Sequence, residues 1–563
     1  MSRPFFTFII LSVSTLFTVA VAQTEEKTDE IISPTEFIKE VKSDLSKAAP
    51  SEAEWVDDVF APLFLSPSST CSIQDTVILT VERLRSKNIK LTTGVVGYLH
   101  GVHAHISSDS LEISKWNGWH SSINSMNENR KWYKKLTAYL QISEKLFNQN
   151  IIADSRASRW QHVGGTMTLG VDSLPYVSFS GSTLVCYAKG DSATIRNTSG
   201  KYFPSRGVWE GNGGQVHWEG TTFNDSTNFA VLSDYDIKLN GSSFKAGPVS
   251  FHTDLFDKVL TGDLTFKVSR SKSPEEKIYP RFESDSEKLF LEDFFPNMDF
   301  EGGIVVKGSR LDGTGVDEGK GLLKIYQEDT LFIKCSLNEI MFRKDGFGSI
   351  NSELAIYLGN DSIYHPGLSV RYDRPSNKLM FIRTEDGIGM QPFVDSYHNI
   401  DFQVEAITWR VGDPTIKIGS LLQGGRGVGI FRSVANFDKP SYDSMMGIAS
   451  IHPLSELRHF MKNRASNSFY ASEYANHLRL PEATVKFMLI DLALNGYVSY
   501  DEEDGWCEWL PKADTHLKCN KGRSDYDVIA FRSEVGNGAN AVLALNTMAL
   551  EIAGIRAFRV SEA

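Results

Sequence analysis

Hydrophobic positions follow a helical spacing in the first quarter of the chain. Between residues 33 and 150, three stretches place apolar residues three or four apart, which puts them on one face of a helix. The first stretch begins at Ser33-Pro34-Thr35-Glu36, where Ser can cap a helix, Pro fits its first turn and Glu can complete a capping box. The three apolar faces are Phe37, Ile38, Val41 and Leu45; Val77, Ile78, Val81 and Leu84; and Trp132, Tyr133, Leu136, Leu140 and Phe147. We therefore expect a mainly helical N-terminal region.

The pattern changes near residue 160. From there, short runs alternate apolar and polar residues and are separated by Gly, Asn, Asp and Ser, as in 235–239, 264–268 and 354–358. Such alternation is typical of half-buried antiparallel strands. No helical pattern connects these runs, which argues against a doubly wound α/β enzyme.

A weak internal repeat runs through these predicted strands. Each copy is a strand, a turn and a return strand, and is too small to bury its own apolar face, so we expect neighbouring copies to stack. The sequence thus predicts an elongated β-solenoid or a curled β-sheet, with an ordinary sandwich as the alternative. The copies are Ile237, Leu239, Phe244, Gly247, Val249 and Phe251; Ile356, Leu358, Ile363, Gly367, Leu368 and Val370; and Leu543, Leu545, Leu550, Gly554 and Ile555. The last copy nearly reaches Ala563, from which we expect the chain to be the front part of a longer protein.

Helical spacing returns between residues 454 and 500. Three helical patterns cover 454–461, 470–478 and 481–492, and a strand follows Gly496. This segment resembles a winged helix-turn-helix, because Ala475 falls in the tight helix crossing and the later apolar residues fall in that family's third helix and first wing strand. Those later residues are Thr484, Val485, Leu489, Leu492, Gly496, Tyr497 and Val498. The resemblance implies a fold, and no ligand.

DNA binding is not expected of this segment. The positions that match the family's base-facing side are Glu482, Ala483 and Phe487, and the wing carries Asp501-Glu502-Glu503-Asp504. A DNA-recognition helix needs Arg, Lys, Asn or Gln at its base-facing positions, and nearby cations to contact the DNA phosphates. The whole chain has 58 Lys and Arg against 70 Asp and Glu, a formal net charge of -12, which repels nucleic acid in general.

The N-terminus reads as an export signal. Arg3 precedes an apolar stretch from Phe5 to Val21, and Ala20-Val21-Ala22 fits a small-x-small cleavage site. The alternative is an uncleaved membrane anchor. No later stretch reaches the roughly 18 apolar residues that a membrane helix needs, so we expect no transmembrane segment in the mature chain. Export makes a disulfide between Cys507 and Cys519 chemically reasonable. Cys186 and Cys335 lie in apolar runs and are expected to be buried thiols, and four sequons start at Asn197, Asn224, Asn240 and Asn360.

Several groups of residues could suggest a binding site. His100-x-x-His103-x-His105, with His120 nearby, is the best metal candidate, although it lacks an H-E-x-x-H motif and clustered histidines are often incidental. Gly424 to Gly429 lacks the Lys-Ser/Thr of a phosphate loop, and a turn between strands is the better interpretation. We therefore assign no catalytic, cofactor-binding or metal-ligating residue and expect no cofactor.

A carbohydrate-active site would need different groups. It would require several carboxylates in one groove, and candidates are Asp361, Asp373, Asp386 and Asp401. Trp209, Trp218 and Trp409 could stack on sugars, although their apolar surroundings favour the core.

The sequence predicts a mainly β protein with five parts. These are a signal peptide at 1–22, a mainly helical region at 23–158, a β-repeat domain at 159–450, a winged-helix-like insertion at 451–523 and a β-repeat continuation at 524–563. The tandem short strands resemble the β repeats of the lipopolysaccharide-transport (OstA-like) family, as found in large bacterial cell-envelope proteins. This resemblance implies an apolar trough for acyl chains.

We expect a non-catalytic exported protein of the periplasm or cell surface, associated with the outer membrane. It would serve as a scaffold or lipid-facing bridge whose helical insertions bind envelope proteins. The alternatives are an exported β-helix enzyme acting on polysaccharide, either a lyase or a glycoside hydrolase, and a glycan-binding adhesion module.

Overall fold

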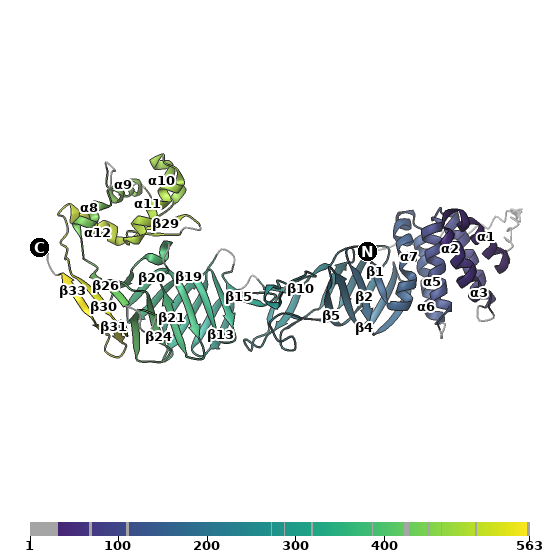
Figure 1. The fold of residues 1–563 in the computed structure, drawn as a ribbon, viewed down its shortest axis with the longest axis horizontal. Helices are drawn as coiled ribbons and strands as arrows, with labels where there is room; N and C mark the ends of the chain where they lie inside the picture. The colour runs from purple at the N-terminus through teal and green to yellow at the C-terminus, as the bar shows by residue number, and fades with distance from the viewer. Residues whose placement is uncertain are drawn as a thin grey trace, which may run out of the picture. The chain divides into compact units, whose positions relative to one another are not determined.

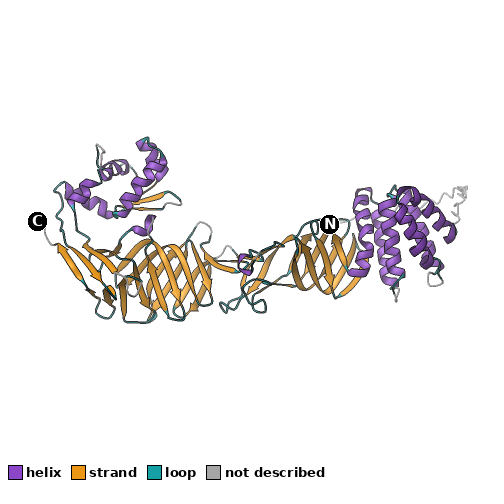
Figure 2. Ribbon diagram, in the orientation of Figure 1, coloured by secondary structure: helices purple, strands orange, loops and turns teal. Residues whose placement is uncertain are grey.

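A computed structural model describes the chain from residue 32 to residue 559, apart from 67–69, 109–111, 272, 286–287, 317–318, 385–386, 422–426, 447–450, 463, 465 and 502–503. The protein is mainly β, with 42% strand and 30% helix, and the strands form a large antiparallel sheet (Figure 2). Its contacts divide it into two compact units. One holds Met1–Trp116 and Met126–Asn148, and the other holds Asn117–Ser125 and Gln149–Ala563. The proposed signal peptide lies outside the described residues.

Helices precede the first strand, which confirms the expected helical N-terminal region. The first helix begins as its sequence indicates, because the Ser33 hydroxyl accepts a hydrogen bond from the Glu36 amide at 3.3 Å. The apolar faces read from the sequence are buried in α1 and α4. The helices are α1 (Pro34–Ala48), α2 (Pro50–Trp55), α3 (Ala61–Phe64), α4 (Cys71–Ser86), α5 (Val96–Ile106), α6 (Ile113–Asn127) and α7 (Tyr133–Gln149), with π-helical turns at Val56–Phe60 and Leu91–Val95. In the described part of the chain, no helix is both long and apolar enough to cross a bilayer.

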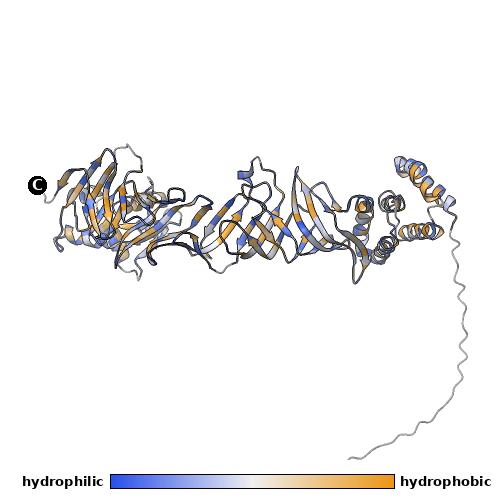
Figure 3. Ribbon diagram, turned by 90° about the horizontal axis from the view of Figure 1, so that it is seen from below, coloured by the Kyte–Doolittle hydropathy of each residue, from blue (hydrophilic) through white to orange (hydrophobic). Residues whose placement is uncertain are grey.

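Antiparallel strands make up most of the second unit. Their alternation of apolar and polar positions is visible along the ribbon in Figure 3. The first group is β1 (Ile151–Asp154), β2 (Arg159–Val163), β3 (Thr166–Val171), β4 (Pro175–Ala188), β5 (Asp191–Phe203), β6 (Val208–Asn212), β7 (Gln215–His217), β8 (Phe229–Val231), β9 (Asp234–Lys238), β10 (Ser243–His252) and β11 (Leu260–Lys267). The second group is β12 (Arg281–Ser284), β13 (Leu289–Phe295), β14 (Met298–Lys307), β15 (Arg310–Thr314), β16 (Gly321–Gln327), β17 (Thr330–Leu337), β18 (Glu339–Arg343), β19 (Gly346–Leu358), β20 (Asp361–Asp373) and β21 (Lys378–Ile382). The third group is β22 (Phe393–Asp395), β23 (Ile400–Gln403), β24 (Ala406–Arg410), β25 (Thr415–Gly419), β26 (Gly427–Ser433), β30 (Ala530–Val535), β31 (Ala539–Ala544), β32 (Ala549–Ile552) and β33 (Ile555–Arg559).

Long strands with a bulge at mid-length divide the sheet into two walls. The first half of β19 pairs with β18 and the second half with β17, while β20 pairs along both halves of β19 and then with β21 at one end and β22 at the other. The β19–β20 register shifts around Ser352, close to Asn351 at φ 54°. Such a bulge bends a strand, so each half can belong to a different wall. The β4–β5 pair has the same kind of shift beside Gly181 and Asn197, both with positive φ.

Each wall then continues as a separate ladder. One runs β21–β24–β25–β31–β32, and the other, called here the second wall, runs β22–β23–β26–β30–β33. Aromatic rings meet between the walls: Trp409 of β24 lies edge-on to Phe332 of β17, with ring centroids 5.0 Å apart. A phenylalanine row crosses the inner face of the second wall in register. Its members Phe393, Phe402 and Phe431 are fully buried, Phe531 is half-buried and Phe558 is exposed.

A helical module, defined as residues 437–527, interrupts the second wall between β26 and β30 (Figure 1). Its apolar core is continuous and includes the residues that the helical spacing indicated, such as Leu454, Leu457 and Leu489. Arg479 in the left-handed region lies between α10 and α11, and Gly496, also at positive φ, follows α11. The elements are α8 (Lys439–Ser444), α9 (Pro453–Met461), α10 (Ala471–Leu478), α11 (Glu482–Leu494) and α12 (Pro511–Asn520), with a small sheet of β27 (Ser468–Tyr470), β28 (Val498–Tyr500) and β29 (Trp506–Trp509).

Two short elements differ in type from the regions in which they were expected. Strand β1 falls inside the range 23–158 that was expected to be helical, and helix α8 falls inside the range 159–450 that was expected to be β. Both elements are short, at four and six residues, so neither contains enough positions to display a period.

Candidate functional site

A cavity of about 400 Å³ lies between the outer face of the second wall and the helical module. The wall supplies strands β23, β26, β30 and β33 to it, and the module supplies residues of α8, α11 and α12. Its volume falls in the range of small-molecule sites.

Two cross-strand rows form the wall side of this cavity. In the first row, Asp401, Arg432, Ala530 and Arg559 face one another in register across the four strands. In the second, Gln403, Ile430, Arg532 and Ala557 do the same, and all eight residues line the cavity. Directly paired residues share a face of a sheet, so the three arginines lie on the same face. The alanines between them leave the space that a larger side chain would fill.

Ion pairs tie both ends of the first row to the helical module. The Lys512 ammonium lies 2.9 Å from the Asp401 carboxylate, and Asp401 is only 6% exposed. At the other end, an Arg559 guanidinium nitrogen lies 3.4 Å from an Asp438 oxygen. Arg432, between these ends, is exposed and has no polar partner among the described residues. The row therefore holds one guanidinium available to a ligand.

The lining is positive in an acidic protein. Four cations, Arg432, Arg532, Arg559 and Lys512, face two carboxylates, Asp401 and Asp438. His516 adds no charge at neutral pH, because burial lowers its pKa to about 4, with a smaller contribution from Lys512 that the Asn436 backbone carbonyl partly opposes. The Tyr497 hydroxyl lies 2.9 Å from Nδ1 of His516 and fixes the ring.

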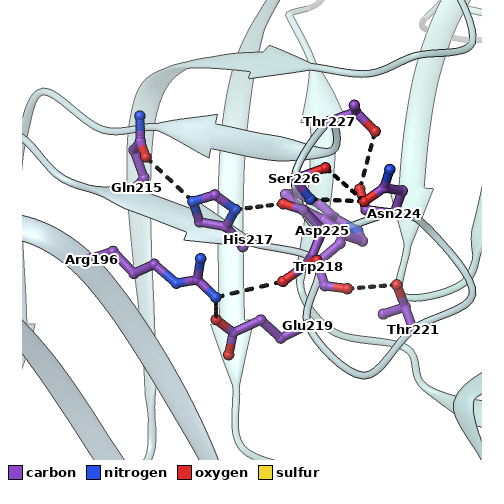
Figure 4. Close-up of polar contacts among 10 residues, drawn as sticks. All are labelled: Arg196, Gln215, His217, Trp218, Glu219, Thr221, Asn224, Asp225, Ser226 and Thr227. Atoms are coloured by element: carbon purple, nitrogen blue, oxygen red, sulfur yellow. Dashed lines mark hydrogen bonds and ion pairs between the residues drawn. The ribbon is translucent and has the colours of Figure 1, made fainter.

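A second polar cluster surrounds the loop between β7 and β8 (Figure 4). The Arg196 guanidinium pairs with Glu219 and lies 3.5 Å from a carboxylate oxygen of Asp225. Nδ1 of His217 lies 2.5 Å from the Asp225 carbonyl oxygen, and Asn224 accepts hydrogen bonds from the backbone and hydroxyl of Ser226. Most of these contacts join residues of the loop to one another or to the strands beside it, so the cluster holds the loop in place.

The histidine candidates of the sequence do not converge. His100 stacks on Trp55 and lies 3.0 Å from Glu52, whereas His105 is buried against Trp116 and Phe147. Burial lowers the pKa of His105 to about 4. Within the described ranges, no three His, Cys, Asp or Glu residues are placed to hold a metal ion.

The carboxylate candidates are also dispersed. Asp361 and Asp373 lie at opposite ends of β20, where each accepts hydrogen bonds from a nearby serine. Asp386 lies outside the described residues, and Asp401 alone lines the cavity.

The tryptophan and glycine candidates have structural roles. Trp209, Trp218 and Trp409 are at most 1% exposed, so they belong to the core as their apolar surroundings indicated. Of the glycine-rich segment, Gly427 to Gly429 begin strand β26 and not a helix, while 424–426 lie outside the described residues.

The cysteines and sequons lie where their surroundings suggest. All five cysteines are free, and Cys186, Cys335, Cys507 and Cys519 are buried, so the structure holds no disulfide between Cys507 and Cys519. Cys71 is exposed. The sequon residues Asn197, Asn224, Asn240 and Asn360 are exposed.

Sequence reasoning missed the arginines of the cavity. Arg432, Arg532 and Arg559 come from three strands that are up to 127 positions apart, since 559 − 432 = 127. Only cross-strand register brings them together, and register cannot be read from one sequence. Comparison with protein-family models, curated proteins and solved structures gave no match.

Proposed function

We propose that the chain is a non-catalytic exported protein of the cell envelope, in which the two-walled sheet is a rigid scaffold and the helical module contacts protein partners. Export rests on the signal-like residues 1–22. The stacking of bent strand pairs supports a curled β repeat, and the helix order and small sheet of the module support a winged-helix variant. The observation that carries the proposal is the exposed ring of Phe487 on α11.

The packing between the two walls favours a scaffold rather than a lipid-binding trough. The phenylalanines on the inner face of the second wall from β22 to β26, Phe393, Phe402 and Phe431, are fully buried. Their rings stack in succession, with centroids 5.2 and 5.7 Å apart. A core packed in this way leaves no room for an acyl chain without moving side chains.

Helix α11 supports a partner-binding role. Its buried side packs Val485, Leu489 and Leu492 into the module, yet Phe487 is 74% exposed on another side. A helix that is apolar on several sides is usually covered on several sides. The same position in a DNA-reading helix would carry a polar side chain, so this surface fits a protein partner better than nucleic acid.

Photo-crosslinking in cells tests the partner-binding role. A photoreactive amino acid at Phe487 should give discrete protein adducts. The matched control is Ile350, an apolar residue of β19 that is 69% exposed and lies outside the module. Equal adduct patterns from both positions would contradict a specific role for α11.

Native mass spectrometry of the mature chain tests the scaffold. We expect a mass that begins at Gln23 and carries no lipid. Near-stoichiometric phospholipid or glycolipid after solvent extraction would replace the scaffold with the lipid-facing bridge. A mass that retains residues 1–22 would contradict the proposed cleavage.

A further inference from the structure

We propose that the cavity between the second wall and the helical module binds an organic dianion, either a phosphate monoester or a dicarboxylate, through Arg432 and its neighbouring arginines. This inference goes beyond the scaffold proposal and does not depend on it. The cavity would give the module a ligand-dependent contact with the sheet.

The placement of the arginines fits an anion. Arg432 and Arg559 lie on either side of Ala530 in one row, and Arg532 lies beside Ala557 in the next row of the same face. The guanidinium group donates several hydrogen bonds in a planar fork that matches carboxylate and phosphate oxygens. Two arginines across a small residue can therefore hold one anionic group from both sides.

The charge balance of the cavity fits an anionic ligand group. Four cations and two carboxylates line the cavity, and Glu534 beside it pairs with Arg532, so the formal charge of the group is +1 when His516 is neutral, since 4 − 3 = 1. The two carboxylates already have partners, Lys512 and Arg559. Arg532 pairs with Glu534 at 3.1 Å, so Arg432 is the cation in the lining that lacks a partner among the described residues. An anionic ligand group on Arg432 would complete this set of ion pairs.

The remaining lining fits an organic body. Met445, Leu494 and Val528 contribute apolar surface, and a volume of about 400 Å³ exceeds what a bare phosphate needs. Most small-molecule sites combine an apolar lining with a few convergent polar groups. Because the sheet supplies the arginines and Ile430 while the module supplies Met445 and Leu494, a bound ligand would touch both.

Isothermal titration of the mature full-length chain tests the site. Phenyl phosphate and phthalate are the two probes, and benzyl alcohol is the uncharged control of similar size. We expect saturable one-to-one binding of at least one dianion and none of benzyl alcohol. The dianion that binds more tightly identifies the ligand class. If neither dianion binds at about 10 mM, a concentration that detects even a weak site, the proposal is wrong.

Matched arginine variants locate the binding. Arg432→Gln should weaken the binding of the dianion at least tenfold. Arg556→Gln removes an exposed arginine of β33 that does not line the cavity, and should leave affinity unchanged. Both side chains are exposed, so both variants should keep the wild-type melting temperature without ligand. Equal weakening by the two variants would mean general charge attraction and would overturn the site.

Discussion

The two faces of the second wall differ in what they contribute to the protein. The inner face of β22, β23 and β26 carries the buried phenylalanine row. The outer face of β23 and β26 carries Asp401 and Arg432 and borders the cavity. Successive residues of one strand therefore lie alternately in the core and at the cavity, because side chains alternate between the faces.

The difference between the faces predicts where substitutions are costly. Removing a fully buried side chain loses its transfer free energy and leaves a cavity, whereas exposed polar groups exchange their contacts for water. Expected effects therefore range from several kcal/mol for a buried ring to less than about 1 kcal/mol for an exposed ion pair.

The largest effect is expected at Phe402. Phe402→Ala should reduce the opening free energy of β23 and β26 by about 3–5 kcal/mol, because the ring is fully buried between Phe393 and Phe431. Hydrogen exchange of peptides from these strands measures that free energy. The control is Gln403→Ala, the next residue on the outer face, which should stay within about 0.5 kcal/mol of wild type. Similar losses from both variants would contradict the separation of the faces.

A smaller effect is expected where the module meets the wall. Lys512→Met should destabilise the docked module by about 2–3 kcal/mol, because it leaves the buried Asp401 carboxylate without its 2.9 Å partner. Protection of the α12 amides from hydrogen exchange is the measurement. Adding Asp401→Asn should recover most of the loss, since the amide carries no unpaired charge. Failure of Lys512→Met to change protection would show that the pair does not hold the module.

Acid should weaken the sheet through His365. Burial lowers the pKa of this histidine to about 3, with a smaller contribution from Arg383 that the Gln391 backbone carbonyl opposes. The folded ring is neutral, because Nδ1 accepts from the Gly367 amide at 3.1 Å and Nε2 donates to the Gln391 carbonyl at 3.0 Å.

The sign of this pH effect follows from the two states. The unfolded chain takes up a proton near pH 6.5 and the folded chain does not, so stability is constant above that pH and falls toward about pH 3. Between pH 7 and pH 5 the loss from His365 should be about 2 kcal/mol. Hydrogen exchange of β20 across this range should show a gentler slope in His365→Gln. Identical slopes would assign the acid sensitivity elsewhere.

Sequence predicted the features that depend on local patterning. Helical spacing located the buried faces of α1 and α4, and apolar alternation placed Trp209, Trp218 and Trp409 in the core. Neither the bulges that divide β19 between two walls nor the arginine rows have a local signature. Both depend on pairing between distant strands, which one sequence does not specify. The sequence therefore indicated β structure but supplied only Asp401 of the cavity.

The smallest effect is expected in the loop cluster of Figure 4. Arg196→Ala should cost less than about 1 kcal/mol, because Arg196, Glu219 and Asp225 keep 41%, 41% and 48% of their side-chain surface exposed and water replaces the lost contacts. Hydrogen exchange of residues 218–228 measures the change. Salt screens exposed charges, so the effect should shrink further at about 1 M salt. A loss above about 2 kcal/mol that persists in salt would show that this exposed cluster contributes as much stability as buried side chains do. Burial would then not explain the difference between the two faces of the second wall.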